Sequence, residues 1–256
     1  MQEMKTEFGC VRFSDLPGEK TPIVFIHGWG CAGSFDYTEC VSSAALAGHR
    51  RVLVDMLGAG YSDKPENFDY LPQSHARYIC ELVKRLNLGE FIVCGHSLGA
   101  RAAVAVAENL PHEVKGVILI EGSIEKEFLP YIDEGEAKFV SENREKFIAD
   151  CTNDEDMRFV ASMRQWSAVA LWRSANELMS ESSGEWARRF YALNQPKIFI
   201  AGGASDEGGF DLGAIAKAGI DVLSVPGATH AMIWETPALA AEWIAKAAAK
   251  LTKDGL

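Results

Sequence analysis

The sequence predicts an α/β fold: a doubly wound, mostly parallel sheet with a small helical cap inserted between strands. In the first half of the chain, short apolar runs alternate with helical patterns. Between about residues 124 and 193 only helical periodicity is found, and the apolar runs then resume. Strands alternating with helices are typical of a parallel sheet covered on both faces. We therefore expect residues 1–123 and 194–256 to form the sheet domain and residues 124–193 to form the cap.

Six apolar runs are expected to be strands. None of them alternates with polar residues, which favours strands buried on both faces. They are residues 21–26, 51–55, 91–94, 117–120, 197–202 and 221–225. Helical periodicity separates them at residues 74–86, 101–109 and 237–251. Within the cap, Asn153 precedes three acidic residues, which indicates the start of a helix.

Charge and composition exclude several classes of partner. The chain of 256 residues has a formal net charge of −11 and 48% hydrophobic residues. An acidic surface repels phosphates and anionic lipids, so we expect neither a nucleic acid nor a membrane as partner. No apolar run is long enough to cross a bilayer, and no signal peptide is evident. The six scattered cysteines favour reduced thiols and a cytoplasmic protein.

A G-x-S-x-G motif is the strongest functional signal. Gly95, Ser97 and Gly99 follow an apolar strand and precede a helix rich in small residues. In this context the motif forms a tight turn that exposes the serine hydroxyl in front of a helix N-terminus. The small neighbours are required because the turn leaves no room for larger side chains. Ser97 is therefore the candidate nucleophile.

The chain resembles the α/β-hydrolase family over nearly its whole length. Besides the serine motif, the resemblance includes H-G-W-G at residues 27–30 and D-M-L-G-A-G-Y-S at residues 55–62. The family more often has proline where Leu57 stands and histidine where Ala59 stands; both differences fall in a structural turn. The resemblance implies an enzyme that needs no cofactor and no metal, and the chain has no H-x-x-E-H motif or paired His and Cys spacing.

The resemblance also implies which backbone groups and which base assist Ser97. The N–H groups of Trp29 and Leu98 would hold the oxyanion formed during acyl transfer. His230, in the loop between the last strand and the last helix, would be the base. His27 and His96 are expected to be structural. The remaining three histidines, His49, His75 and His112, are expected at the surface.

The acid that orients the base has two main candidates. Asp206 follows the penultimate strand, 230 − 206 = 24 residues before the histidine, at the usual position of the family acid. Glu121 ends an earlier strand, where some family members place their acid. We favour Asp206 and keep Glu121 as its main alternative, with Glu207 and Asp211 as weaker ones.

The resemblance implies a serine hydrolase, with a carboxylesterase as the first expectation. Its substrate would be a small, mostly apolar molecule with an ester or activated acyl group. Trp166, Trp172, Trp186 and Met232 are expected in the pocket, because aromatic and methionine side chains offer adaptable apolar surface. The same triad also serves carbon–carbon bond hydrolysis, acyl transfer and cofactor-free perhydrolysis. A hydrolase-like receptor that binds a small ligand without turnover is the alternative from another class.

Overall fold

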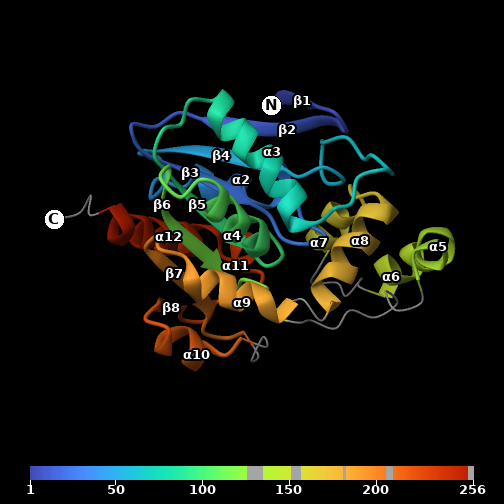
Figure 1. Cartoon of the computed structure of the whole chain (residues 1–256). Helices are drawn as coiled ribbons and strands as arrows, with labels where there is room; N and C mark the ends of the chain where they lie inside the picture. Colours follow the sequence, from blue (N-terminus) through green and yellow to red (C-terminus); the bar gives the residue numbers. More distant parts are fainter. Residues whose placement is uncertain (126–134, 151–156, 181–182, 206–209, 253–256) are drawn as a thin grey trace.

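A single sheet of eight strands organises the molecule (Figure 1). The structure is a computed structural model that describes residues 1–125, 135–150, 157–180, 183–205 and 210–252. The strand order is β1-β2-β4-β3-β5-β6-β7-β8. All neighbours from β4 to β8 pair in parallel, whereas β1 with β2 and β2 with β4 pair antiparallel. The predicted mostly parallel α/β sheet is confirmed.

The strands are β1 Gln2–Thr6, β2 Gly9–Leu16, β3 Lys20–Ile26, β4 His49–Asp55, β5 Phe91–His96, β6 Val114–Ile120, β7 Lys197–Gly202 and β8 Asp221–Val225. The helices before the cap are α1 Gly33–Asp36, α2 Thr38–Ser42, α3 Pro72–Arg85 and α4 Gly99–Asn109. Those between β6 and β7 are α5 Glu136–Lys138, the π-helix η1 Phe139–Asn143, α6 Arg144–Asp150, α7 Met157–Met163, α8 Ala168–Met179 and α9 Ser183–Ala192. The last three are α10 Leu212–Lys217, α11 Met232–Glu235 and α12 Pro237–Thr252.

The six predicted strands are present, but the first two strands of the sheet were not predicted. In β1 only Met4 is buried, and β2 buries only Val11 and Phe13. These strands lie at the edge of the sheet and next to it, with one face incompletely buried, so they lack the continuous apolar run of a central strand. Their hairpin is closed by Gly9, whose φ of +126° favours glycine.

Two apolar cores lie on opposite faces of the sheet. One contains the inward sides of α3 and α4 together with much of the segment between β6 and β7. The other contains residues of α2, α11 and α12. Burial on both faces explains why the central strands are apolar throughout, and it leaves the strand ends and the loops that follow them to carry polar chemistry.

The segment of residues 124–193, which we call the cap segment, contains helices and no strand among its described residues. Its helices α7 and α8 lie to the right of the sheet in Figure 1. Its beginning and its helix α8 are tied to α4 by Arg101, a fully buried side chain. The Arg101 guanidinium donates to the carbonyl oxygens of Ser123 (2.7 Å), Glu125 (2.8 Å) and Glu177 (2.7 Å). Asn153 lies outside the described residues, and the cap boundaries stay a prediction.

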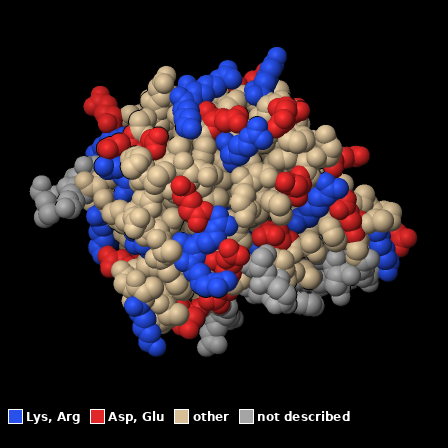
Figure 2. All heavy atoms as spheres, viewed as in Figure 1, with Lys and Arg blue, Asp and Glu red and all other residues tan. Residues whose placement is uncertain are grey.

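The surface carries both signs of charge. Figure 2 shows acidic and basic side chains interspersed on the face it displays, with no large area of one sign. None of the described helices is long and apolar enough to span a membrane. Five cysteines are described and all are free thiols, whereas Cys151 lies outside the described residues.

Candidate active site

The G-x-S-x-G motif forms the tight turn between β5 and α4, which we call the elbow (residues 95–99). Ser97 has a φ of +50°, a conformation that non-glycine residues rarely adopt. A Cβ at Gly95 would lie 2.5 Å from the Gly99 oxygen, and one at Gly99 would lie 2.3 Å from the Ile26 oxygen. Both glycines are therefore required by close backbone contacts, and the predicted strand–turn–helix context of Ser97 is present.

Backbone and side-chain hydrogen bonds hold Ser97 in place. Its N–H donates to the Ile120 oxygen at 3.1 Å, and its carbonyl accepts from the Ser123 N–H at 3.1 Å. The Ser97 Oγ lies 3.2 Å from the Ser123 Oγ, and both residues are buried. In this structure the nucleophile candidate is thus paired with another hydroxyl, and not with a histidine.

His230 lies in the loop between β8 and α11, as the sequence predicts, and its side chain is 47% exposed. Its Nδ1 is 3.3 Å from the Glu121 Oε2. The His230 carbonyl accepts a hydrogen bond from His96 Nε2 at 2.9 Å, and the two imidazole rings are 5.0 Å apart. Because His96 directly precedes Ser97, these contacts bring His230 next to the elbow.

Glu121 is fully buried at the carboxyl end of β6 and has a φ of +47°. Its Oε1 accepts from the Gly202 N–H at 2.5 Å, and its Oε2 accepts from the Ser205 hydroxyl at 3.0 Å. With His230, the carboxylate has three partners, as a buried charge requires. Glu121 is therefore the acid that the described contacts place beside the imidazole.

Asp206, the acid favoured by the sequence, lies outside the described residues, and so does Glu207. Asp211 instead begins α10, where its carboxylate accepts from the Ala214 N–H at 2.8 Å. Of the acid candidates that the structure describes, only Glu121 contacts His230.

Four of the other five histidines are buried, whereas His112 is exposed, as expected. His27 Nε2 accepts from the Met56 N–H at 3.0 Å and its Nδ1 is 2.9 Å from the Gly28 oxygen, so both ring nitrogens are used. Burial lowers the pKa of His96 to about 3 and also lowers the pKa of His75 to about 3. The expectation that His49 and His75 are exposed is wrong: each is only 5% exposed, because it packs beneath neighbouring segments.

The two predicted oxyanion donors lie on different elements. Leu98 follows Ser97 in the elbow, and Trp29 lies in the loop after β3, which with α1 we call the β3 loop (residues 27–36). Within the described part of the chain, neither backbone N–H donates to a protein acceptor. A Cβ at Gly28 would lie 3.0 Å from the Ser97 Cβ, which places the β3 loop directly against the nucleophile.

Four hydrogen bonds between described residues join the β3 loop to the cap segment; one of them runs from the Arg158 guanidinium to the Phe35 oxygen at 3.2 Å. The Trp29 indole N–H donates to the Leu171 oxygen of α8 at 2.9 Å. In the reverse direction, the Trp166 indole N–H donates to the Cys31 oxygen at 2.7 Å. The Ser162 hydroxyl of α7 donates to the Asp36 Oδ2 at 2.9 Å. The β3 loop therefore lies between the sheet and the cap segment and is bonded to both.

Asp36 is a carboxylate buried at this junction. Its Oδ2 also accepts from the Ala32 N–H at 2.6 Å, while its Oδ1 has no partner among the described residues. Burial raises the pKa of Asp36 to about 6; its hydrogen bonds and the nearby Arg158 oppose this rise, and Asp55 adds to it. Such a buried, half-satisfied carboxylate is costly, which indicates a specific positional role.

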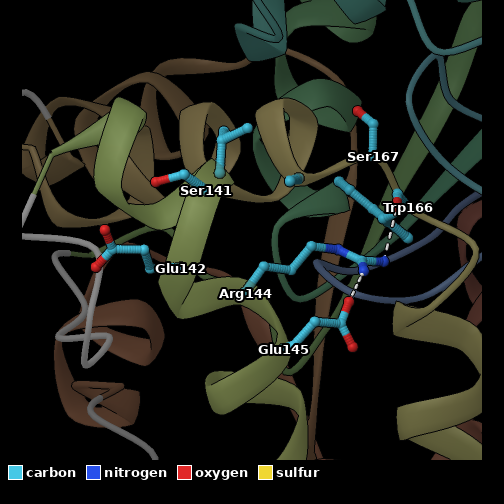
Figure 3. Close-up of a pocket in the computed structure, with 8 residues that line it drawn as sticks. Ser141, Glu142, Arg144, Glu145, Trp166 and Ser167 are labelled. Carbon is cyan, nitrogen blue, oxygen red and sulfur yellow. Dashed lines mark hydrogen bonds and ion pairs between the residues drawn. The ribbon is translucent and has the colours of Figure 1, made fainter.

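The predicted pocket residues lie in separate places. Trp166 is 2% exposed and forms one wall of a cavity of about 410 Å³ within the cap segment, where Arg144 donates to its carbonyl oxygen (Figure 3). Trp186 is buried on α9, with its indole N–H 3.2 Å from Glu177 Oε1. Trp172 is partly buried on α8, and Met232 packs in the core beneath α12. Their assignment to one substrate pocket stays a prediction.

Aromatic residues that the sequence analysis did not assign to a pocket lie closer to the histidine pair. The Trp234 ring is 5.9 Å from the His96 ring, and the Phe159 ring of α7 stacks on Trp234 at 6.2 Å. Ser123, Arg101 and Asp36 were not recognised from the sequence either. For Arg101 and Asp36 a signal existed, since a charged residue within an apolar segment indicates a buried pair or anchor.

No group of three or more potential metal ligands is found among the described residues. The chemistry that the site offers is that of a hydroxyl, an imidazole with a carboxylate partner and two unpaired backbone N–H groups.

Comparison with known proteins supports a hydrolase fold. Residues 21–206 match the family model described as "alpha/beta hydrolase fold". The 2-(acetamidomethylene)succinate hydrolase of Mesorhizobium japonicum is 40% identical over 82 residues, which are 32% of this chain and 27% of that protein. The alignments with the first three curated relatives cover only 22–38% of those proteins.

Solved structures match over nearly the full chain. A carboxylesterase structure from Nitrososphaera gargenis has a TM-score of 0.81 at 16% identity and covers 99% of this chain and 100% of that one. The N-acyl homoserine lactonase AidH, complexed with N-butanoyl homoserine, has a TM-score of 0.79 at 18% identity, with 98% and 97% covered. At such identities the likeness concerns the fold. Together with the family model, it shows that this chain belongs to the α/β hydrolase fold family.

Proposed function

We propose that the protein is a serine hydrolase that cleaves an ester or activated acyl bond of a small, mostly apolar molecule. The observation that carries the proposal is the position of Ser97, at positive φ in a glycine-bounded elbow, beside a loop that presents His230 paired with Glu121. The pairing of nucleophile, base and orienting acid in this chain order is the arrangement used for acyl transfer.

In the proposed reaction, the Ser97 Oγ attacks the carbonyl carbon while its proton passes to His230 Nε2. The Trp29 and Leu98 N–H groups hold the oxyanion. The C–O bond to the leaving alcohol then breaks, and His230 returns the proton to that alcohol. Water repeats the sequence on the acyl-enzyme and releases the acid. The Ser97 hydroxyl must turn from Ser123 toward His230 as the substrate binds, a rotation about one side-chain bond.

Glu121 is the orienting acid in this proposal, in place of Asp206. Its contact with His230 Nδ1 holds the imidazole with Nε2 available to accept the proton, and its negative charge stabilises the imidazolium. The Gly202 N–H and the Ser205 hydroxyl fix the carboxylate itself.

The preference for apolar acyl groups is supported by the aromatic pair Phe159 and Trp234 beside His96. Apolar area removed from water contributes about 25 cal/mol per Å², so such a wall favours apolar over charged acyl groups. Cyclic esters belong in the substrate panel, because lactone opening uses the same attack on a carbonyl.

The proposed function is tested by the loss of probe labelling and of ester hydrolysis in Ser97→Ala. A fluorophosphonate probe should label the wild-type protein and not this variant, and p-nitrophenyl butyrate hydrolysis should fall by roughly 10⁶-fold, toward the uncatalysed rate. Ser174→Ala is the matched control, since Ser174 is also buried but its hydroxyl has no partner among the described residues. Labelling of Ser97→Ala at the wild-type rate would refute the assignment of the nucleophile.

A second experiment separates the two acids. Glu121→Gln should lower kcat by about 10⁴-fold, as expected when the orienting carboxylate of a triad becomes an amide. Asp206→Asn should cost much less. If the larger loss occurs in Asp206→Asn, the acid is Asp206 and only the orienting role of Glu121 is wrong, because Ser97 would still be labelled.

A further inference from the structure

The two oxyanion donors of the proposed reaction are held in place by different parts of the structure. The Leu98 N–H belongs to the elbow, which the sheet and α4 hold. The Trp29 N–H belongs to the β3 loop, which has glycine on either side of Trp29 and a φ of +73° at Gly30. A loop with that much backbone freedom needs external contacts to keep an N–H pointing in one direction.

Those external contacts come from the cap segment. Trp166 donates to the Cys31 oxygen, and Ser162 donates to Asp36, which in turn accepts from the Ala32 N–H. These bonds hold the backbone two and three residues after Trp29. On the other side, the Trp29 side chain is fixed by its bond to the Leu171 oxygen and by the Phe147 ring, 5.4 Å away.

Side-chain packing also joins the β3 loop to the cap segment. Trp166 is 2% exposed and its ring meets His27 edge-on at 5.7 Å. A Cβ at Gly30 would lie 2.8 Å from a ring carbon of Phe159, so cap residues touch the loop directly. Asp36, Ser162 and Trp29 are all buried, and hydrogen bonds in such surroundings are stronger than those exposed to water.

We propose that Ser162 and Trp166 of the cap segment are positioning residues for catalysis: they hold the β3 loop so that the Trp29 N–H points at the oxyanion. The inference rests on the proposed acyl-transfer function. It assigns the cap a role in the chemical step, beyond forming the roof of a pocket. Because a donor must meet the oxyanion within a few tenths of an ångström, loss of one cap contact should reduce transition-state stabilisation without removing the donor.

The experiment compares two buried serines of the cap helices. Ser162→Ala removes a hydroxyl that bonds Asp36, whereas Ser174→Ala removes one that has no partner among the described residues. We expect Ser162→Ala to lower kcat for p-nitrophenyl butyrate five- to tenfold with KM changed less than twofold. Ser174→Ala should leave both constants unchanged. Trp166→Phe keeps an aromatic ring at this position and removes the N–H donor, so it should resemble Ser162→Ala.

Inhibition by a transition-state analogue tests the positioning role separately, because a merely structural role of these residues would not alter the inhibition constant. A trifluoromethyl ketone forms a tetrahedral adduct whose oxygen needs both donors. Its inhibition constant should weaken in Ser162→Ala and Trp166→Phe by the same factor as kcat/KM. If Ser162→Ala is insoluble, Ser162→Cys keeps the size, weakens the donor and replaces it in the comparison.

Folded Ser162→Ala and Trp166→Phe variants with wild-type kcat and wild-type affinity for the ketone would overturn the inference. So would equal losses in Ser162→Ala and Ser174→Ala, because these would indicate a general effect on the cap. Neither result touches the proposed function, which fails only if Ser97→Ala retains labelling and turnover.

Discussion

The elbow carries the candidate nucleophile and the β3 loop lies against it, but different contacts hold the two regions in place. The elbow is held by backbone contacts: the Ile26 oxygen would be 2.3 Å from a Cβ at Gly99, and Ser97 is hydrogen-bonded to β6. The β3 loop is held by side chains distant in sequence, such as Trp166, which is 166 − 31 = 135 residues beyond its acceptor at Cys31. One half of the site is therefore held by the backbone of the sheet, and the other half depends on side chains of the cap segment.

This difference has a consequence for substitution. A change at the elbow meets rigid backbone, so the chain cannot relax around it. A change at the β3 loop meets side chains of the cap, which can move or be replaced. Compensating changes should thus be found for the loop and not for the elbow. The three predictions below test this contrast, from the largest effect to the smallest.

The largest effect is expected at the elbow. In Gly99→Ala the new Cβ would overlap the carbonyl oxygens of Ile26 and His27, at 2.3 and 2.6 Å. We expect a loss of more than about 4 kcal/mol in the free energy of unfolding, seen as low soluble yield or a large drop in Tm. Gly184→Ala on α9 is the control, since a Cβ there meets nothing within 4 Å. It should stabilise the protein by about 0.5–1 kcal/mol, and equal effects at both sites would contradict the steric account.

The second prediction is that two buried residues, one in each region, contribute to the pH dependence of stability with opposite signs. At the elbow, burial lowers the pKa of His96 to about 3, below its ordinary 6.5. The unfolded chain therefore binds a proton there that the folded chain does not, and folded stability is lost as the pH falls from 6.5 toward 3. In the β3 loop, burial raises the pKa of Asp36 from 3.8 to about 6, so stability is lost as the pH rises from 4 to 6.

Urea unfolding between pH 4 and pH 6 measures both effects. His96→Gln should make the free energy of unfolding rise less with pH than in the wild type, and Asp36→Asn should make it rise more. Each slope changes by at most about 1.4 kcal/mol per pH unit. Slopes are compared because a uniform loss of stability in either variant does not alter them. Changes of the same sign in both variants would refute the contrast.

The smallest effect concerns a compensating change. Gly30→Ala imposes a positive φ on alanine and brings its Cβ 2.8 Å from the Phe159 ring, which together should cost about 1–2 kcal/mol. Adding Phe159→Leu should recover about 0.5 kcal/mol or more of this loss in a double-mutant cycle. The same Phe159→Leu should recover nothing in Gly99→Ala. Simple additivity of Gly30→Ala and Phe159→Leu would show that the cap does not restrain the loop.

Much of the fold followed from the sequence because the relevant signals are local. Six apolar runs predicted the central strands, and the glycines around Ser97 predicted the elbow, since a tight turn imposes the same residues wherever it occurs. The edge strand β1 and its neighbour β2 were missed because strands with one incompletely buried face have few apolar residues.

What the sequence by itself determined is thus the family, the parallel sheet and the elbow with Ser97, each specified by residues close together in the chain. The partner of His230 required the tertiary structure, because Glu121 and Asp206 both follow parallel strands and both precede the histidine. Only the folded chain brings the Glu121 carboxylate within 3.3 Å of the imidazole. The tertiary structure also decided the bonds from Ser162 and Trp166 to the β3 loop, because hydrogen bonds between segments more than 100 residues apart leave no pattern in either segment alone.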